Sequence, residues 1–355
     1  MTVDAPVPVP GSGVTFVMPV LNEQEYLERA VQTVLQQDVD GPAELILALG
    51  PSTDGTTELA RRLADEDDRI RLVENPRADI PVALNLAIRA AHHPTIVRVD
   101  AHSELAPGYT RRALATLERA RAANVGGVMR ADGRTPFQRA VAIAYNSPIG
   151  LGGGAYHVGA PEGPAESAYL GVMRREVLQQ VGLFDETIRR GEDWELNLRI
   201  RRAGYRVWFD PELAVTYWPR ESWVRLARQF LATGTWRGEL VRRFGRSNSL
   251  RFFAPPALVL AVVASVVVGV LQGAGIVGGA LSAVLSVFHL PLALYVLGIV
   301  AVSLIAGRAL RERCWLLVVL PTMHLAWGAG FLVGLVRGAK DTIDTSRLDR
   351  NTPLP

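Results

Sequence analysis

The sequence predicts an α/β domain with a mostly parallel sheet, followed by an all-α region that enters a membrane. Between Val14 and Ala123, strand-length apolar runs alternate with segments of helical periodicity, which is the pattern of βαβ units. Beyond Ala254, three long stretches carry no charged residue. The expected organisation is a flexible arm (1–13), the α/β domain (14–219), a basic amphipathic segment (220–253), a transmembrane region (254–336) and a C-terminal tail (337–355).

The predicted elements follow one another from Val14 onward. The expected strands are residues 14–20, 44–49, 70–73, 95–99, 125–129 and 169–173, and the expected helices are residues 23–37, 56–64, 80–91, 107–123, 174–181 and 191–203. Asn22 is expected to cap the first helix, because a short amide side chain suits that position. Residues 131–168 are rich in Gly and Pro with little periodicity, which predicts an irregular segment.

Charge is distributed unevenly along the 355 residues. Residues 1–219 carry 23 Arg and Lys against 29 Asp and Glu, whereas residues 220–253 carry 8 against 2 and residues 254–355 carry 7 against 4. The basic excess therefore lies beside the apolar region, as in segments that contact anionic lipid. No nucleic-acid motif accompanies it, so a nucleic-acid partner is not expected.

Two features suggest that the α/β part lies in the cytoplasm. The first apolar run, Val14–Val20, has the length of a strand and no basic stretch precedes it, unlike a secretory signal. The single cysteine, Cys314, excludes an internal disulfide and any multi-cysteine metal site, which is consistent with a reducing compartment. We therefore expect a multi-pass protein of the cell membrane with its α/β domain in the cytoplasm.

The run Thr95–His102 ends a predicted buried strand in a carboxylate, Asp100, and an imidazole, His102. Alternate residues of an extended chain point the same way, so both side chains would face one ion beyond the strand. Oxygen with imidazole suits Mn²⁺ somewhat better than Mg²⁺, and carboxylate with phosphate oxygens suits either ion. The same residues also fit a strand that runs into a turn, with Asp100 as a helix N-cap.

Five motifs occur in order along the chain, and together they resemble one family. They are Met18-Pro-Val-Leu-Asn-Glu23, Ser52-Thr-Asp-Gly-Thr56, Ala83-Leu-Asn-Leu-Ala87, Val99-Asp-Ala-His102 and Gly191-Glu-Asp-Trp-Glu-Leu-Asn197. The chain resembles the family 2 inverting glycosyltransferases with a GT-A fold, in the membrane-bound branch that includes succinoglycan glucosyltransferases. The resemblance covers about residues 14–237, and the order of the motifs makes it specific although each motif alone is weak.

The resemblance implies a nucleotide-sugar site at the carboxyl edge of a Rossmann-like sheet. Asp100 and His102 would hold Mn²⁺ or Mg²⁺ together with the diphosphate of the donor, which is expected to be a UDP-hexose. Many relatives have an acidic residue that binds the base, whereas this chain has Leu49-Gly50-Pro51, so its recognition of the base differs in part. The other residues that would border the donor are Pro19, Glu23, Asp54 and Asn85.

Glu192 and Asp193 lie in the first turn of a predicted helix, where the helix dipole alone would favour acidic residues. Transfer of a sugar with inversion needs a base that takes the proton of the acceptor hydroxyl while the nucleoside diphosphate leaves from the opposite face. The resemblance implies this role for Asp193, with Glu192 raising its pKa or orienting the acceptor. Asp193 is therefore expected to lie close to Asp100 and His102.

The segment Arg228–Arg237 resembles a loosened Gln and Trp motif that contacts diphosphate and acceptor in membrane synthases of this family. The resemblance implies such roles for Gln229, Trp236 and Arg237. The spacing differs from that of processive synthases, which disfavours a cellulose-type or hyaluronan-type polymerase. Residues 220–253 also fit a basic amphipathic segment that lies on anionic lipid, and both interpretations can hold together.

The number of membrane spans is open between three and four. Residues 254–271 and 315–336 would each form one span, whereas residues 275–307 are long for one span and short for two. Arginine positions do not decide between the two. Three spans would leave the cluster at 308–313 inside and the C-terminal arginines outside, and four spans would reverse this. We favour three spans, with a re-entrant piece at 275–289.

The predicted function is that of a membrane-anchored, metal-dependent, inverting hexosyltransferase. It would move a hexose from a nucleotide sugar to a lipid-linked or growing envelope glycan, and residues 131–168 would contact this acceptor. A polyprenyl-phosphate sugar synthase is an alternative, because its phosphate acceptor needs no hydroxyl base. A non-catalytic membrane interaction module is an alternative of another class.

Overall fold

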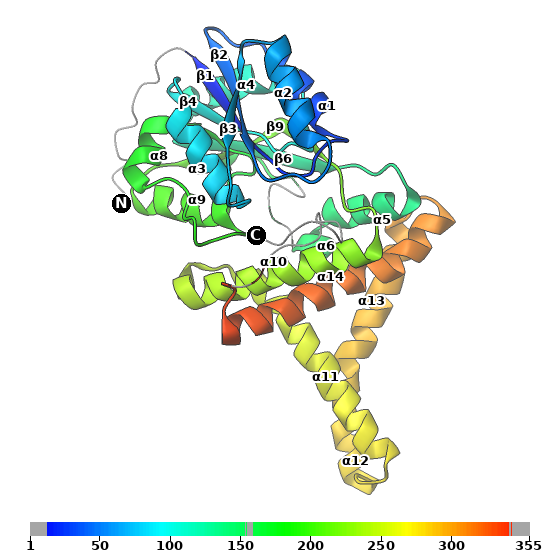
Figure 1. The fold of residues 1–355 in the computed structure, drawn as a ribbon. Coiled ribbons are helices and arrows are strands. Elements are labelled where there is room, and N and C mark those ends of the chain that lie inside the picture. The colour runs from blue at the N-terminus through cyan, green and yellow to red at the C-terminus, as the bar shows by residue number, and fades with distance from the viewer. Residues whose placement is uncertain (1–12, 153, 155–158, 341, 343–355) are drawn as a thin grey trace. The chain divides into compact units, whose positions relative to one another are not determined.

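A computed structural model describes residues 13–152, 154, 159–340 and 342 of the chain. It divides into two compact units (Figure 1). The described residues of the first unit are 13–132, 154 and 159–218, and this unit holds the sheet. The second unit combines Gly133–Gly152 with the helices that follow Pro219.

The first unit is built on one mixed sheet with strand order β3-β2-β1-β4-β8-β6-β9-β5. Its first half is parallel and comprises β1 (Val14–Val20), β2 (Ala43–Leu49), β3 (Ile70–Glu74) and β4 (Thr95–Arg98). The other strands are β5 (Ser103–Leu105), β6 (Asn124–Ala131), β7 (Gly163–Pro164), β8 (Val172–Arg174) and β9 (Val207–Tyr217). Strand β8 lies between β4 and β6 and is antiparallel to both.

Each face of the sheet carries its own apolar core, because successive strand residues point to opposite faces. Phe16 belongs to the core under α1 (Leu27–Leu35), α2 (Thr56–Glu66) and α4 (Tyr109–Arg119). Its neighbour Val17 belongs to the core under α3 (Ile80–Ala90), α8 (Arg175–Val181) and α9 (Glu192–Arg202). This alternation within β1 fixes its register, since a slip by one residue would exchange the two faces.

Most predicted elements of this unit agree with the structure, but one expectation is wrong and one long strand was not predicted. Asn22 does not cap a helix, because it adopts φ 54° and its side chain accepts a hydrogen bond from the Thr53 N–H at 2.8 Å; α1 begins only at Leu27. Strand β9 was not predicted because Pro211 interrupts its apolar pattern. The register between β6 and β9 shifts near this proline, which lets the strand continue past it.

The expectation of irregular structure at 131–168 is also wrong for its first part. This part forms α5 (Pro136–Tyr145) and α6 (Pro148–Leu151), which belong to the second unit. Thr135, just before Pro136, and Gln138, in the first turn of α5, form a capping box, so the signal for a helix start was present in the sequence. Residues 153 and 155–158 of this segment lie outside the described residues.

The second unit is helical. After α5 and α6 come α10 (Trp223–Phe244), the short helices η1 (Gly245–Ser247) and η2 (Leu250–Phe253), and α11 (Ala254–Gly273). They are followed by α12 (Gly279–Leu285), η3 (Ser286–His289), α13 (Leu290–Ala306) and α14 (Leu310–Arg337). Among the described residues, three helical stretches are long and apolar enough to cross a membrane: Leu250–Gly273, Gly279–Ala306 and Leu310–Arg337.

Helices α10 and α14 lie side by side and run in the same direction (Figure 1). Glycines let the two backbones touch, because a Cβ atom on Gly234 would collide with the carbonyl oxygen of Trp327, and one on Gly334 with that of Thr235. Gly238 and Gly330 complete a four-residue spacing of glycine on each helix. The close contact between α10 and α14 therefore depends on the glycine pattern, and apolar character alone would not produce it.

We expect Gly334→Val to lower the thermal unfolding midpoint of the detergent-solubilised protein. The added side chain must push α10 and α14 apart, and overpacking of this kind costs about 1–3 kcal/mol or more. Gly298→Val is the matched control, since Gly298 also lies within a membrane-type helix and has open space around its Cβ position. Equal midpoints for the two variants would contradict the close contact.

Candidate functional site

The centre of the site is Arg98, the last residue of β4, whose side chain is only 5% exposed. Its Nη1 donates hydrogen bonds to Asp193 Oδ1 at 2.5 Å and to Glu192 Oε1 at 3.1 Å. Its Nη2 donates to Asp100 Oδ1 at 3.3 Å. The expected proximity of Asp193 to Asp100 is therefore observed, with one guanidinium between the two carboxylates.

The balance of charge around Arg98 affects proton binding. Burial alone would lower the pKa of the Arg98 guanidinium, but the carboxylates of Asp193, Asp100 and Glu192 raise it above its ordinary value, so Arg98 stays charged. Removal from bulk water raises the pKa of the Asp193 carboxyl to about 7; the charge of Arg98 opposes this rise, and those of Glu192 and Asp100 add to it. One cation cannot neutralise three carboxylates, and Asp193 keeps a 24% exposed edge where a proton can exchange.

Asp100 and His102 are close, but not through an extended chain as expected. Strand β4 ends at Arg98, and the chain turns so that the Ser103 N–H donates to the Asp100 carbonyl oxygen at 2.9 Å. The turn leaves His102 Nε2 at 3.9 Å from Asp100 Oδ2. His102 Nδ1 lies 3.2 Å from Glu23 Oε1, so Glu23 orients the imidazole.

These side chains fit a divalent cation that also binds the substrate. A carboxylate and an imidazole nitrogen lie side by side, and a carboxylate holds the other nitrogen of the ring, as around metal-binding histidines. In the described part of the chain, no group of three or more His, Cys, Asp and Glu residues is arranged to hold a metal alone. Phosphate oxygens and water would have to complete the coordination, as is usual for Mg²⁺ at phosphate sites.

The loops that follow β1 and β2 are tied to each other. The Asp54 carboxylate accepts hydrogen bonds from the Thr56 N–H at 3.0 Å and from the Gln24 N–H at 3.3 Å. The Thr56 hydroxyl in turn accepts one from the Glu23 N–H at 2.8 Å. Asp54 therefore shapes the loop edge beside Glu23, and Pro19 lies near the end of β1, paired with β2.

Asn85 is placed differently from the other predicted donor residues. Its amide is buried on α3, where Nδ2 donates to the Phe184 carbonyl oxygen at 2.9 Å and Oδ1 accepts from the Phe184 N–H at 3.0 Å. Nδ2 also donates to Glu186 at 3.0 Å. Because both ends of the amide bind the 184–186 loop, Asn85 supports the loop that precedes α9.

Gln229, Trp236 and Arg237 lie on α10 in the second unit. Trp236 is buried, and its Nε1 donates to the Thr342 carbonyl oxygen at 3.1 Å. The guanidinium of Arg237 stacks on the Phe252 ring at 4.1 Å from its centroid. Trp236 and Arg237 thus have structural partners within their own unit, and Gln229 is buried there as well.

The sequence-based prediction missed Arg98, although a signal was present. Arg98 is the one charged residue in the apolar run Thr95–Val99, and a charge on a buried strand requires carboxylate partners. Asn197 was quoted in a motif without a role. Its Nδ2 donates to the Asp193 carbonyl oxygen at 2.7 Å and its Oδ1 accepts from Asn124 at 2.7 Å, which joins the first turn of α9 to β6.

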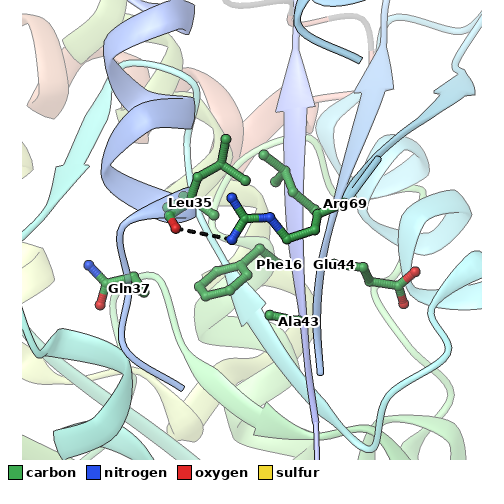
Figure 2. A pocket seen from close by; sticks show the side chains of 8 residues that line it. Phe16, Leu35, Gln37, Ala43, Glu44 and Arg69 are labelled. Carbon is green, nitrogen blue, oxygen red and sulfur yellow. Dashed lines mark hydrogen bonds between the residues drawn. The ribbon is translucent and has the colours of Figure 1, made fainter. Parts of the chain in front are cut away.

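A separate small cavity lies at the opposite ends of the strands, near the start of β2 (Figure 2). Phe16, Ala43 and Arg69 are among its lining residues, and Arg69 Nη1 donates to the Leu35 carbonyl oxygen at 3.2 Å. Its volume of about 20 Å³ admits a water molecule but no nucleotide sugar. It therefore has no part in the site around Arg98.

Comparison with known proteins identifies the family. Residues 15–182 match the model of the glycosyl transferase family 2. The chain is 32% identical over 330 residues to the succinoglycan biosynthesis protein ExoA of Rhizobium meliloti (strain 1021). This alignment covers 89% of this chain and 93% of ExoA. The chain belongs to glycosyltransferase family 2. It is thus an enzyme of the glycosyltransferase class, and its α/β unit is of the GT-A type.

Two more distant similarities concern one enzyme known by its sequence and one solved structure. A Methanococcus voltae enzyme, dolichyl N-acetyl-alpha-D-glucosaminyl phosphate 3-beta-D-2,3-diacetamido-2,3-dideoxy-beta-D-glucuronosyltransferase, is 22% identical over 268 residues, 73% of this chain and 82% of that enzyme. The mannosyltransferase PcManGT of Pyrobaculum calidifontis, solved with GDP-Man and Mn²⁺, superposes with a TM-score of 0.61 at 20% identity, over 95% of this chain and 90% of PcManGT. The second similarity shows the fold of this glycosyltransferase.

We expect Asn85→Ala to reduce stability without changing the KM for a nucleotide sugar. The substitution leaves the buried N–H and carbonyl groups of Phe184 without partners, which costs about 1–3 kcal/mol. Thermal unfolding and donor kinetics of the purified protein measure both effects, with the exposed amide of Gln32 on α1, changed to Ala, as control. A higher KM at unchanged stability would return Asn85 to the donor site.

Proposed function

We propose that this family 2 enzyme is a membrane-anchored, metal-dependent, inverting hexosyltransferase. It moves a hexose from a nucleotide sugar to a hydroxyl of a lipid-linked or growing envelope glycan, on the cytoplasmic side of the cell membrane. The observation that carries this proposal is the convergence of Asp193 and Asp100 on Arg98, beside His102. It brings a candidate proton acceptor next to candidate metal ligands at one end of the sheet.

Asp193 is the proposed base. It begins α9 with a partly exposed carboxylate, and Asn197 and Arg98 hold its backbone and its side chain. The proton of an acceptor hydroxyl passes to an Asp193 carboxylate oxygen while the new bond forms at the anomeric carbon, and the nucleoside diphosphate leaves from the opposite face. Glu192, which shares Arg98 with Asp193, adds negative charge nearby and favours proton uptake.

Arg98 is the proposed positioning residue. Its planar fork binds carboxylates from two places, the turn after β4 and the start of α9, which are far apart in the sequence. It thereby fixes the separation of the base from the donor end of the site. Small errors in such a separation lower rates strongly, because the reacting atoms must meet at a defined distance.

Asp100 and His102 are the proposed ligands of Mn²⁺ or Mg²⁺. The cation, when bound, neutralises charge that develops on the leaving diphosphate. Glu23 orients the imidazole of His102 for this role. The complex of PcManGT with GDP-Man and Mn²⁺ supports a divalent cation for this fold. The choice of UDP-hexose as the first candidate donor, and thus of its nucleobase, rests on the sequence alone.

The names of two relatives support the proposed acceptor. ExoA is named for the synthesis of a polysaccharide, and the Methanococcus voltae enzyme for transfer to position 3 of a sugar on dolichyl phosphate. Both names favour a sugar hydroxyl as acceptor over the phosphate of a polyprenyl chain. A hydroxyl acceptor requires a base, and Asp193 is available for that purpose.

We expect Asp193→Asn to lower kcat by about 10²–10⁴-fold without loss of nucleoside diphosphate binding, because the amide cannot take the proton. Release of nucleoside diphosphate by detergent-solubilised protein with Mn²⁺ and a lipid-linked sugar measures the rate. Asp65→Asn, an exposed carboxylate on α2, is the control. Retention of most activity in Asp193→Asn would indicate a polyprenyl-phosphate synthase; a wild type that neither binds nor turns over a donor would indicate an interaction module.

We expect Arg98→Lys to lower kcat and to raise the KM for the donor much less. The fold decrease in kcat should exceed the fold increase in KM by about tenfold to a hundredfold. Lysine keeps the positive charge but cannot bind carboxylates on both sides as the arginine fork does. Arg112→Lys is the matched control, since Arg112 also binds a buried carboxylate, that of Asp210, at 2.9 Å through two nitrogens outside the site. An increase in KM alone would assign Arg98 to donor binding and not to placement of the base.

A further inference from the structure

Helix α14 has the composition of a membrane span but the packing of an interfacial helix. Its residues 314–336 carry no charge, yet protein covers one side of it along its whole length. At its start, Arg139 of α5 binds Glu312 at 2.9 Å and Phe137 packs edge-to-face on Trp315. We propose that α14 lies in the plane of the membrane surface, so that only α11 and the α12–α13 segment cross the bilayer.

The second half of α14 is bound to α10. Trp223 Nε1 donates to the Thr322 hydroxyl at 2.7 Å, and the glycine contacts continue to Gly334. At the end, Gly338 lies beside the side chains of Glu239 and Arg242. The two helices therefore share one path and one depth from Thr322 to Gly338.

Helix α10 cannot share a path through the apolar core of a membrane. Its 22 residues include six charged ones, Arg225, Arg228, Arg237, Glu239, Arg242 and Arg243. Charged side chains are strongly unfavourable at the centre of a bilayer, whereas a basic amphipathic helix is stable at its surface. Because α14 is fixed to α10 backbone to backbone, α14 must lie at the surface too.

The two sides of α14 fit a surface location. Leu316, Val319, Leu320, Met323 and Phe331 are buried and follow the helical repeat along the protein-facing side. The large apolar side chains that remain exposed, Trp315, Leu317, Val318, Val333, Leu335 and Val336, are available to lipid. Within the most apolar 18-residue stretch of each segment, the protein buries 39% of α14, against 17% of the stretch that contains α11 and 11% of the α12–α13 segment.

Arginine positions agree with this topology. Two spans return the chain to its starting side, so Arg308, Arg311 and Arg313 around the start of α14 and Arg337 and Lys340 around its end all face the side that holds α10. The turn on the far side, Ala274–Gly278, carries no charge. The asymmetry satisfies the positive-inside rule, which neither three nor four spans could do. The lipid partner of this layer is an anionic membrane surface.

The hairpin of α11 and α13 has the properties of a true spanning element. The two helices contact each other (Figure 1), and most of their apolar side chains are exposed. At about 1.5 Å per residue, the 24 and 28 residues of the two stretches reach about 36 and 42 Å, enough for a bilayer core of about 30 Å. His289, at the end of η3 just before α13, hydrogen-bonds to Ser265 at 2.8 Å and to Gln272 at 3.1 Å, both on α11, and so joins the pair.

Side-specific labelling tests the topology in the full-length protein, whose one native cysteine is removed by Cys314→Ser. Single cysteines are introduced as Glu58→Cys in the α/β unit, Ile276→Cys at the far turn and Lys340→Cys after α14, and an impermeant maleimide is applied to sealed vesicles of known orientation. We expect positions 58 and 340 to react from one side and position 276 from the other. If position 340 is labelled from the same side as position 276, α14 crosses the membrane. If position 276 is labelled from the same side as position 58, the hairpin does not cross. Either result overturns the proposal.

Depth measurements give an independent test. Spin labels at Leu317→Cys and Val333→Cys, both on the exposed side of α14, are separated by 16 residues, or about 24 Å along the helix. A helix in the plane of the surface places both at the same shallow depth in vesicles that contain phosphatidylglycerol. A spanning helix places them at clearly different depths, a result that would refute the in-plane arrangement.

Discussion

The α/β unit depends on the burial of one guanidinium at the end of β4. A charge at this depth is stable only with opposite charges around it, and Arg98 obtains them from Asp100, Glu192 and Asp193. The turn after β4 and the first turn of α9 are thereby brought to the same point. The arrangement of a possible base beside possible metal ligands is thus a consequence of how the buried charge is compensated.

Residues without a direct chemical role hold this arrangement in place. Asn85 ties α3 to the loop that leads into α9, Asn197 holds the first turn of α9, and Asp54 joins the loops after β1 and β2. The family motifs therefore mix two kinds of residue, those that we propose to face the donor and those that fix the loops. A motif alone cannot separate them, because an amide or a carboxylate serves hydrogen bonding in both cases.

In the helical unit the corresponding constraint is the glycine contact between α10 and α14. It binds a helix with six charges to one whose central run has none. The depth of α10 then limits the depth of α14, whatever the hydropathy of α14 by itself. Hydropathy describes what a segment tolerates, and packing decides which tolerated location it takes.

The sequence by itself determined the alternating strands and helices from β1 to β4, the family, and the presence of apolar helices, because these follow from periodicity, motif order and the lack of charge. It did not determine the course of β9 past Pro211, the helix α5, or the partners of Arg98 and Asn85. These depend on which distant segments meet, as when β6 accommodates a register shift or when three carboxylates converge on one arginine. Only the tertiary structure decided them, since a side chain has the same local pattern whether it supports a loop or faces a substrate.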